Sequence, residues 1–415
     1  MPGLRSLSRN HDFTVLWVGT TISQLGSSVS ALAFPLLGFA LTHSAIVTSV
    51  VGSLEMAGNL VALLPAGILA DRVDRHRIMR WSALLGAVLY AAVVAADLGG
   101  ALAIWELYVA AFLTGVAAGL FLPAETAAVR AVVAPADLPG ALSQNQSRQW
   151  IASLLGSPLG GALYGVLRWL PFAADAVSYA VNWLALGTLR TDLAPPPRPA
   201  SATKAWRDIV DGWRYIFGDP FLRILGVWSP LANLSINAVF YVATLRLIQA
   251  GFPGWQIGLS ESIVGVLGIL GAVMAPALID RIRTGTLMVI VSWAFVPLMV
   301  LIALWNDPWV LAGSAGAGVF VNPAGNAGIS AYAQRIVPDG MLGRYSSTMS
   351  FTSMSLHPFA PLLAGGALAL LGGRPAVFAI MGLCALVAMI PTLSRAIWAI
   401  PRPAQWVVPE AVAAV

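Results

Sequence analysis

Residues 64–75 read LPAGILADRVDR, and residues 273–283 read VMAPALIDRIR. In each stretch an apolar run ends in an Asp-Arg pair, Asp71-Arg72 in the first and Asp280-Arg281 in the second. The two stretches lie at corresponding places in the two halves of the chain, each at the end of the second apolar run of its half. This correspondence predicts a duplicated unit, an architecture in which a substrate site forms between repeats near the middle of a membrane.

The composition supports a membrane protein. Of the 415 residues, 58% are hydrophobic and 10% are charged, whereas charged residues make up roughly a quarter of a soluble protein. A water-soluble enzyme of this composition would expose large apolar patches, and a disordered chain needs the opposite composition. The net charge of +5 does not indicate nucleic-acid binding, because the basic residues are spread along the chain.

The apolar windows between charged residues are long enough to span a bilayer, which takes about 20 residues as a helix. The sequence therefore predicts an all-α membrane protein with twelve transmembrane helices arranged as two six-helix pseudo-repeats. The predicted spans are 13–41, 45–69, 78–97, 103–131, 141–167, 170–189, 221–250, 255–278, 285–305, 309–333, 345–371 and 375–395.

A polar, proline-rich segment separates the two halves. It carries prolines at 195, 196, 197 and 199 and is followed by an amphipathic stretch from Trp206 to Phe217, typical of a helix lying in a membrane interface. We expect residues 1–190 to form an N-terminal six-helix bundle and 191–220 a cytoplasmic linker with an amphipathic helix. Residues 221–398 would form a C-terminal six-helix bundle and 399–415 a cytoplasmic tail.

Lys and Arg residues set the orientation, because they are enriched in cytoplasmic loops. With twelve spans and an internal N-terminus, all but three of the 23 Lys and Arg residues fall on the inner side, and Arg168, Arg246 and Arg374 fall on the outer side. We therefore expect a multi-pass protein of the plasma or inner membrane with both termini in the cytoplasm.

Several chemistries lack the residues they need. Lys204 is the sole lysine, and no Walker A loop is present, so we expect no ATP hydrolysis by this chain. Cys384 is the sole cysteine, which excludes an internal disulfide and a thiolate zinc site. The four histidines are scattered and no nucleophile-base pattern is evident. We expect no metal, no cofactor and no enzymatic activity.

The segment GILADRVDRHR at residues 67–77 resembles the loop motif G-x-x-x-D-[RK]-x-G-R-[RK] of the major facilitator superfamily. Its place between spans two and three, the twelve-span layout and the long central linker agree with that family. The nearest branch resembles drug/proton antiporters that include macrolide-efflux and enterobactin-exporter-type proteins. The similarity lies at residues 23–26, 121–124 and 138–146.

The resemblance implies an inner gate. Its residues here are Gly67, Asp71, Arg72, Arg75 and Arg77, and the family implies that Asp71 meets the start of span eleven near Gly343-Arg344 in one state only. The alternative is that these arginines act only as topology signals. Asp74 stands where the motif has glycine.

The branch also carries a helix-packing motif in span five, roughly G-P-x-x-G-G. In this chain residues 156–161 read GSPLGG, so Gly156, Gly160 and Gly161 are present and Pro158 is displaced by one position. Glycines allow close helix packing, and proline removes a backbone donor.

Acidic residues inside spans are costly and mark functional candidates. Glu55 lies about ten residues into span two, on the order of 15 Å deep at 1.5 Å per residue. It is the clearest proton-coupling candidate, followed by Asp175 and Glu261. The alternative for each is a structural, hydrogen-bonded carboxyl. Glu125 and Arg130 of span four can also meet Arg148 of span five, either as a pair that breaks during transport or as a static brace.

Polar residues recur at helical spacing in spans one, seven, ten and eleven. Such positions avoid lipid, so they line a substrate path or form interhelical hydrogen bonds. The cavity candidates are Gln24, Ser27, Asn233, Asn237, Tyr241, Asn322, Asn326 and His357.

These features together predict an efflux transporter. It would export an amphipathic small molecule, such as a drug, an antibiotic or a siderophore-like product, by alternating access and in exchange for protons. The expected partners are the small-molecule substrate, protons and the lipid bilayer, with no nucleic acid and no ATP, and the protein is expected to be a monomer. One alternative is a proton-coupled importer of a small polar metabolite on the same fold, and another is an integral-membrane enzyme or channel.

Overall fold

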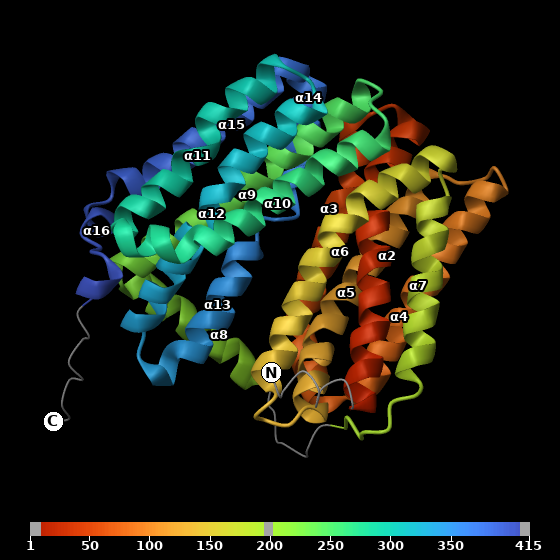
Figure 1. Ribbon diagram of the computed structural model, residues 1–415, viewed down its shortest axis with the longest axis horizontal. Helices are drawn as coiled ribbons and strands as arrows, with labels where there is room; N and C mark the ends of the chain where they lie inside the picture. The colour runs from red at the N-terminus through yellow and green to blue at the C-terminus, as the bar shows by residue number, and fades with distance from the viewer. Residues whose placement is uncertain (1–9, 195–201, 407–415) are drawn as a thin grey trace. The chain divides into compact units, whose positions relative to one another are not determined.

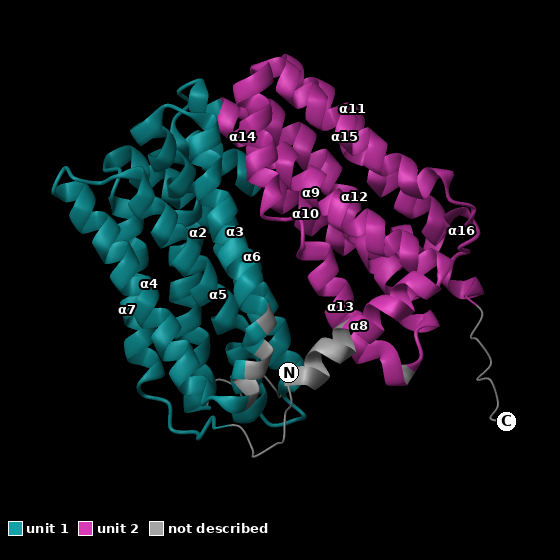
Figure 2. Cartoon of the chain, turned by 180° about the vertical axis from the view of Figure 1, so that it is seen from behind, with its two compact units in different colours: residues 1–200, 247–262 teal, residues 201–246, 263–415 magenta. Residues whose placement is uncertain are grey.

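The structure is a computed structural model that describes residues 10–194 and 202–406, without the side chains of residues 64, 67, 68, 70, 71, 202–209 and 339. The described residues are almost entirely helical (Figure 1). They fall into two compact units, residues 1–200 with 247–262 and residues 201–246 with 263–415 (Figure 2).

Unit 1 is a bundle of six long helices. They are α2 (His11–Thr42), α3 (Ala45–Arg72), α4 (Arg75–Leu98), α5 (Ile104–Val132), α6 (Leu138–Val166) and α7 (Leu170–Leu186). Helix α2 packs on α6 and α7, α3 packs on α5, and α4 packs on α5 and α7. Side chains cap the starts of two of these helices. Asn10 accepts a hydrogen bond from the Phe13 amide, and Ser44 accepts one from Val47.

Unit 2 contains the amphipathic helix and most of the second half. Its helices are α8 (Ala202–Gly218), α9 (Pro220–Gln249), α11 (Thr284–Leu304), α12 (Pro308–Ile336), α13 (Asp339–Met354), α14 (Phe359–Leu371), α15 (Gly373–Leu393) and the short α16 (Arg395–Trp398). Helix α10 (Gly254–Arg281) begins in unit 1 and ends in unit 2. Residues 403–405 form a short 3₁₀ helix.

The two halves repeat the same close packing between their second and fourth helices. In unit 1 a Cβ on Gly115 of α5 would lie 2.0 Å from the Glu55 carbonyl oxygen of α3. In unit 2 a Cβ on Gly271 of α10 would lie 2.0 Å from the Phe320 carbonyl oxygen of α12. Neither site has room for a larger residue, so glycine sets the helix spacing in both halves.

The predicted twelve-helix fold is confirmed. Among the described residues, nine helices are long and apolar enough to cross a membrane, with α13 and α14 counted together. Helices α6, α7 and α12 complete the twelve. They fall below that standard because α7 has 17 residues and because polar residues lower the mean hydropathy of α6 and α12.

Span eleven is broken where one continuous helix was expected. Helix α13 ends at Met354 and α14 begins at Phe359, with a turn between them. Pro358 has no amide hydrogen, and it disfavours helical backbone at His357, which explains the break.

The amphipathic helix α8 packs on protein. The Trp213 indole donates a hydrogen bond of 2.9 Å to Thr352 of α13, and Ile216 is 1% exposed. Part of the apolar face that the sequence assigned to the membrane interface is therefore covered by α13.

Candidate substrate cavity and buried carboxyls

A polar cavity of about 330 Å³ lies inside unit 1. Every helix of the bundle contributes to its wall, and the wall is rich in hydroxyl and amide groups. Its polar lining residues are Thr20, Ser23, Gln24, Ser27, Asn59, Ser82, Glu125, Arg148, Gln149, Ser153 and Tyr179. Two of the predicted cavity residues, Gln24 and Ser27, belong to this wall.

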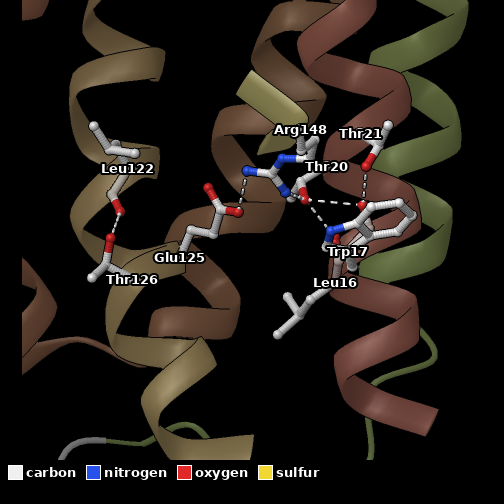
Figure 3. Close-up of polar contacts among 8 residues, drawn as sticks. All are labelled: Leu16, Trp17, Thr20, Thr21, Leu122, Glu125, Thr126 and Arg148. Carbon is white, nitrogen blue, oxygen red and sulfur yellow. Dashed lines mark hydrogen bonds and ion pairs between the residues drawn. The ribbon is translucent and has the colours of Figure 1, made fainter. Parts of the chain in front are cut away.

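A buried ion pair forms part of the cavity wall (Figure 3). Arg148 Nη2 of α6 lies 2.7 Å from Glu125 Oε1 of α5, and the two residues are 3% and 5% exposed. The other terminal nitrogen of Arg148 donates to the Thr20 hydroxyl of α2 (Figure 3). The Arg148 Nε atom is buried and has no hydrogen-bond partner among the described residues.

Of the two acidic and basic residues of span four that were predicted to meet Arg148, Glu125 forms the ion pair. Arg130 lies one turn beyond the pair in sequence and is exposed. Neither member of the pair was predicted to line the cavity. Their charge inside predicted spans is the signal in the sequence, but which helix faces meet depends on packing.

A second polar cluster surrounds Asp175, which is fully buried at 0% exposure. The hydroxyls of Ser30 and Ser178 donate to its carboxylate at 2.6 and 2.9 Å. The Tyr90 hydroxyl lies 3.3 Å from that of Ser30. Three helices, α2, α4 and α7, therefore converge on this one carboxyl.

An aromatic contact links the Asp175 cluster with the cavity wall. Tyr90 stacks on Tyr179 with ring centroids 5.8 Å apart, and Ser27 donates to the Tyr179 hydroxyl at 3.1 Å. Ser27 and Tyr179 both line the cavity. The Asp175 cluster therefore lies against the cavity wall through the contact between Tyr90 and Tyr179.

The other two acidic candidates have different surroundings. Glu55 of α3 is partly buried. Glu261 lies in α10 and is partly buried.

The remaining cavity candidates lie in unit 2. Asn233, Asn322 and Asn326 line a small pocket of about 70 Å³. Asn237 donates to the Asn233 carbonyl at 2.8 Å and lies 3.4 Å from His357 Nε2. Tyr241 is partly buried on the same helix.

The gate motif spans the end of α3 and the start of α4. Arg72 and Arg77 are exposed, Arg75 is partly buried, and Arg77 Nε lies 4.0 Å from Asp74. Gly67 and Asp71 lie outside the residues whose side chains are described.

The packing motif of α6 lies against neighbouring helices. A Cβ on Gly156 would lie 2.2 Å from the Ser28 side chain, and one on Gly160 would lie 2.2 Å from the Val29 carbonyl oxygen. A Cβ on Gly161 would lie 2.0 Å from the Gly254 carbonyl oxygen, and Pro158 lies within α6 beside them. The motif therefore places α6 against α2 and the start of α10.

Known proteins similar to this chain are transporters. The chain is 28% identical over 359 residues to the multidrug efflux pump Tap of Mycolicibacterium fortuitum, covering 82% of this chain and 85% of that protein. It is 22% identical to the enterobactin exporter EntS of Citrobacter koseri, covering 87% and 86% of the two chains.

Solved structures share the fold. The nucleoside transporter NupG matches with a TM-score of 0.69 at 14% identity, over 92% of this chain and 99% of that one. A bacterial homologue of the iron transporter ferroportin in its inward-facing state matches with a TM-score of 0.69 at 16% identity, over 93% and 98%. The sequence profile of the Major Facilitator Superfamily matches residues 16–361. The chain is a multi-pass membrane transporter and belongs to the Major Facilitator Superfamily.

Proposed function

We propose that the protein exports an amphipathic small molecule by alternating access, in exchange for protons. The observation that carries the proposal is the cavity of unit 1, with its hydroxyl and amide lining and its buried ion pair. A polar wall with few charges suits a neutral or weakly charged amphiphile. Two relatives of this chain are an efflux pump and an exporter, which supports outward transport.

The proton site in this proposal is Asp175. Burying an isolated ionised carboxylate is costly unless it is paired, and the hydrogen-bond donors described around Asp175 are hydroxyls. Binding or releasing a proton therefore changes the stability of this packing. The cluster lies beside the cavity, because Tyr90 stacks on Tyr179 of the cavity wall. Glu55, which lies about ten residues into span two, is the second candidate.

The orientation in the proposal has both termini in the cytoplasm of a plasma or inner membrane, as the distribution of basic residues predicts. Fusions of alkaline phosphatase and green fluorescent protein to the C-terminus test it. We expect the green fluorescent protein fusion to be fluorescent and the alkaline phosphatase fusion to be inactive. The opposite pair of results would show that the C-terminus lies outside the cytoplasm.

Everted membrane vesicles test the transport proposal directly. Vesicles with an acidic interior are supplied with a panel of fluorescent amphiphiles, and accumulation of a panel member that an uncoupler abolishes is expected. Vesicles without the protein serve as the control. Flux that does not depend on the pH gradient would indicate a channel. Accumulation only in right-side-out vesicles would indicate an importer.

A further inference from the structure

A basic pocket lies at the start of α4, beside the gate motif. It has a volume of about 460 Å³ and lies within unit 1, between the first turns of α4 and the end of α7. Its lining residues are Asp74, His76, Arg77, Arg80, Trp81, Leu84 and Trp183.

The pocket favours an anion. The Arg80 guanidinium lies 4.7 Å from the centre of the Trp183 ring, and its Nε atom is buried without a hydrogen-bond partner among the described residues. Asp74 is the acid in the pocket, but its carboxylate caps α4 by accepting from the His76 amide at 2.9 Å and lies 4.0 Å from Arg77 Nε. The pocket therefore carries a net positive charge. The two arginines and the positive end of the α4 dipole exceed the charge of the single carboxylate, which already caps the helix.

An apolar groove adjoins the basic pocket. It has a volume of about 400 Å³, and Arg77 and Trp81 line both hollows. The rest of the groove is formed by Leu69, Val73, Ile78, Ser82, Leu85, Ala117 and Leu120. A ligand that fills both hollows must have an anionic end and an apolar chain.

The position of the site identifies the ligand class. Trp81 is 69% exposed at the end of a membrane-spanning helix, and tryptophans at such ends lie at the level of lipid headgroups. Basic pockets between membrane helices bind anionic headgroups. We propose that an anionic phospholipid binds here, with its phosphate on Arg77 and Arg80 and an acyl chain in the groove.

The lipid would lie next to the substrate cavity. Ser82 and Ala117 line both the groove and the cavity, and they are 5% and 2% exposed. A single layer of small side chains therefore separates the acyl chain from the cavity.

Native mass spectrometry of the full-length protein in detergent tests the site. The protein is titrated with dioleoyl phosphatidylglycerol and, separately, with dioleoyl phosphatidylcholine, which has the same chains and no net charge. One phosphatidylglycerol is expected to bind at least about tenfold more tightly, the equivalent of about 1.4 kcal/mol. Equal binding of the two lipids would overturn the proposal.

Three variants localise the effect. Arg80→Gln and Arg77→Gln should each lose most of the preference, and because Arg77 is exposed its replacement leaves the core intact. Arg130→Gln, an exposed arginine in the last turn of α5, is the matched control and should keep the preference. A similar loss in all three variants would show diffuse attraction by the basic surface and overturn the site.

Competition separates a lipid from a simple anion. Dodecyl phosphate, which has both a phosphate and a chain, should displace the bound phosphatidylglycerol, and inorganic phosphate should not. Displacement by inorganic phosphate alone would overturn the role of the groove. These measurements need no transport, so a failure of the proposed efflux would leave them unaffected.

Discussion

Arg148 Nη2 of α6 lies 2.7 Å from Glu125 Oε1 of α5, and the two side chains expose only 2% and 7% of their surface. Removing one member of an ion pair this deeply buried is strongly destabilising, because the remaining member is left as a buried, uncompensated charge. In this protein both members of the pair also line the polar cavity of unit 1.

Breaking the pair should destabilise unit 1. Glu125→Gln and Arg148→Gln are each expected to lower the free energy of unfolding by about 3–5 kcal/mol, and the double variant should lose less than the sum. Chemical unfolding in detergent measures the three values. Arg130→Gln, at an exposed site nearby, should change stability by less than about 0.5 kcal/mol. Strictly additive losses in the double variant would show that the two side chains do not interact.

Asp175→Asn should uncouple transport. The asparagine can still accept the hydrogen bond from Ser30, but it cannot exchange a proton, so accumulation driven by a pH gradient should fall to the level of empty vesicles. Downhill flux of the same substrate should persist. The comparison is Glu55→Gln, which should reduce coupling less, and the reverse ranking would move the proton site to Glu55.

Removing one hydroxyl gives a milder test of the same cluster. Ser30→Ala deletes a 2.6 Å hydrogen bond to Asp175, which is worth about 1.5–3 kcal/mol when the acceptor is charged and about 1 kcal/mol when it is neutral. We expect the pH dependence of transport to shift while the maximal rate is retained. An unchanged pH profile would indicate that Ser30 only packs beside the carboxyl.

Gly160→Ala should loosen the contact between α6 and α2. The added Cβ would lie 2.2 Å from the Val29 carbonyl oxygen, so the backbones must separate, at a cost of about 1–3 kcal/mol. Gly165→Ala on the same helix meets no atom within 4 Å. It should be neutral or stabilising by up to about 1 kcal/mol, since alanine favours helix. Equal thermal stability of the two variants would contradict the packing role.

The gate hypothesis rests on the sequence motif. Asp71→Asn should abolish transport while the protein still reaches the membrane at its normal level, because the gate hypothesis assigns the residue to switching between states and not to folding. Transport assays beside immunoblots of the membrane fraction measure both. Normal transport by this variant would reduce the motif to a topology signal.

The sequence alone determined the membrane fold. Apolar windows of about 20 residues can be read directly because each must cross the bilayer, and the predicted span 13–41 matches α2 (His11–Thr42) closely. The paired Asp-Arg stretches revealed the repeat, and the loop motif indicated the family. The stripe in span one also identified Gln24 and Ser27, which do line the cavity.

The tertiary structure alone decided which polar groups meet. Position along a span made Glu55 the deepest acid, yet Asp175 is the one that is fully buried among hydroxyls. Burial and hydrogen bonding depend on which faces of α2, α4 and α7 are turned toward one another, and those rotations cannot be read from residue spacing along one sequence. For the same reason the Glu125–Arg148 pair was placed in the cavity only by the packing of α5 against α6 and α2.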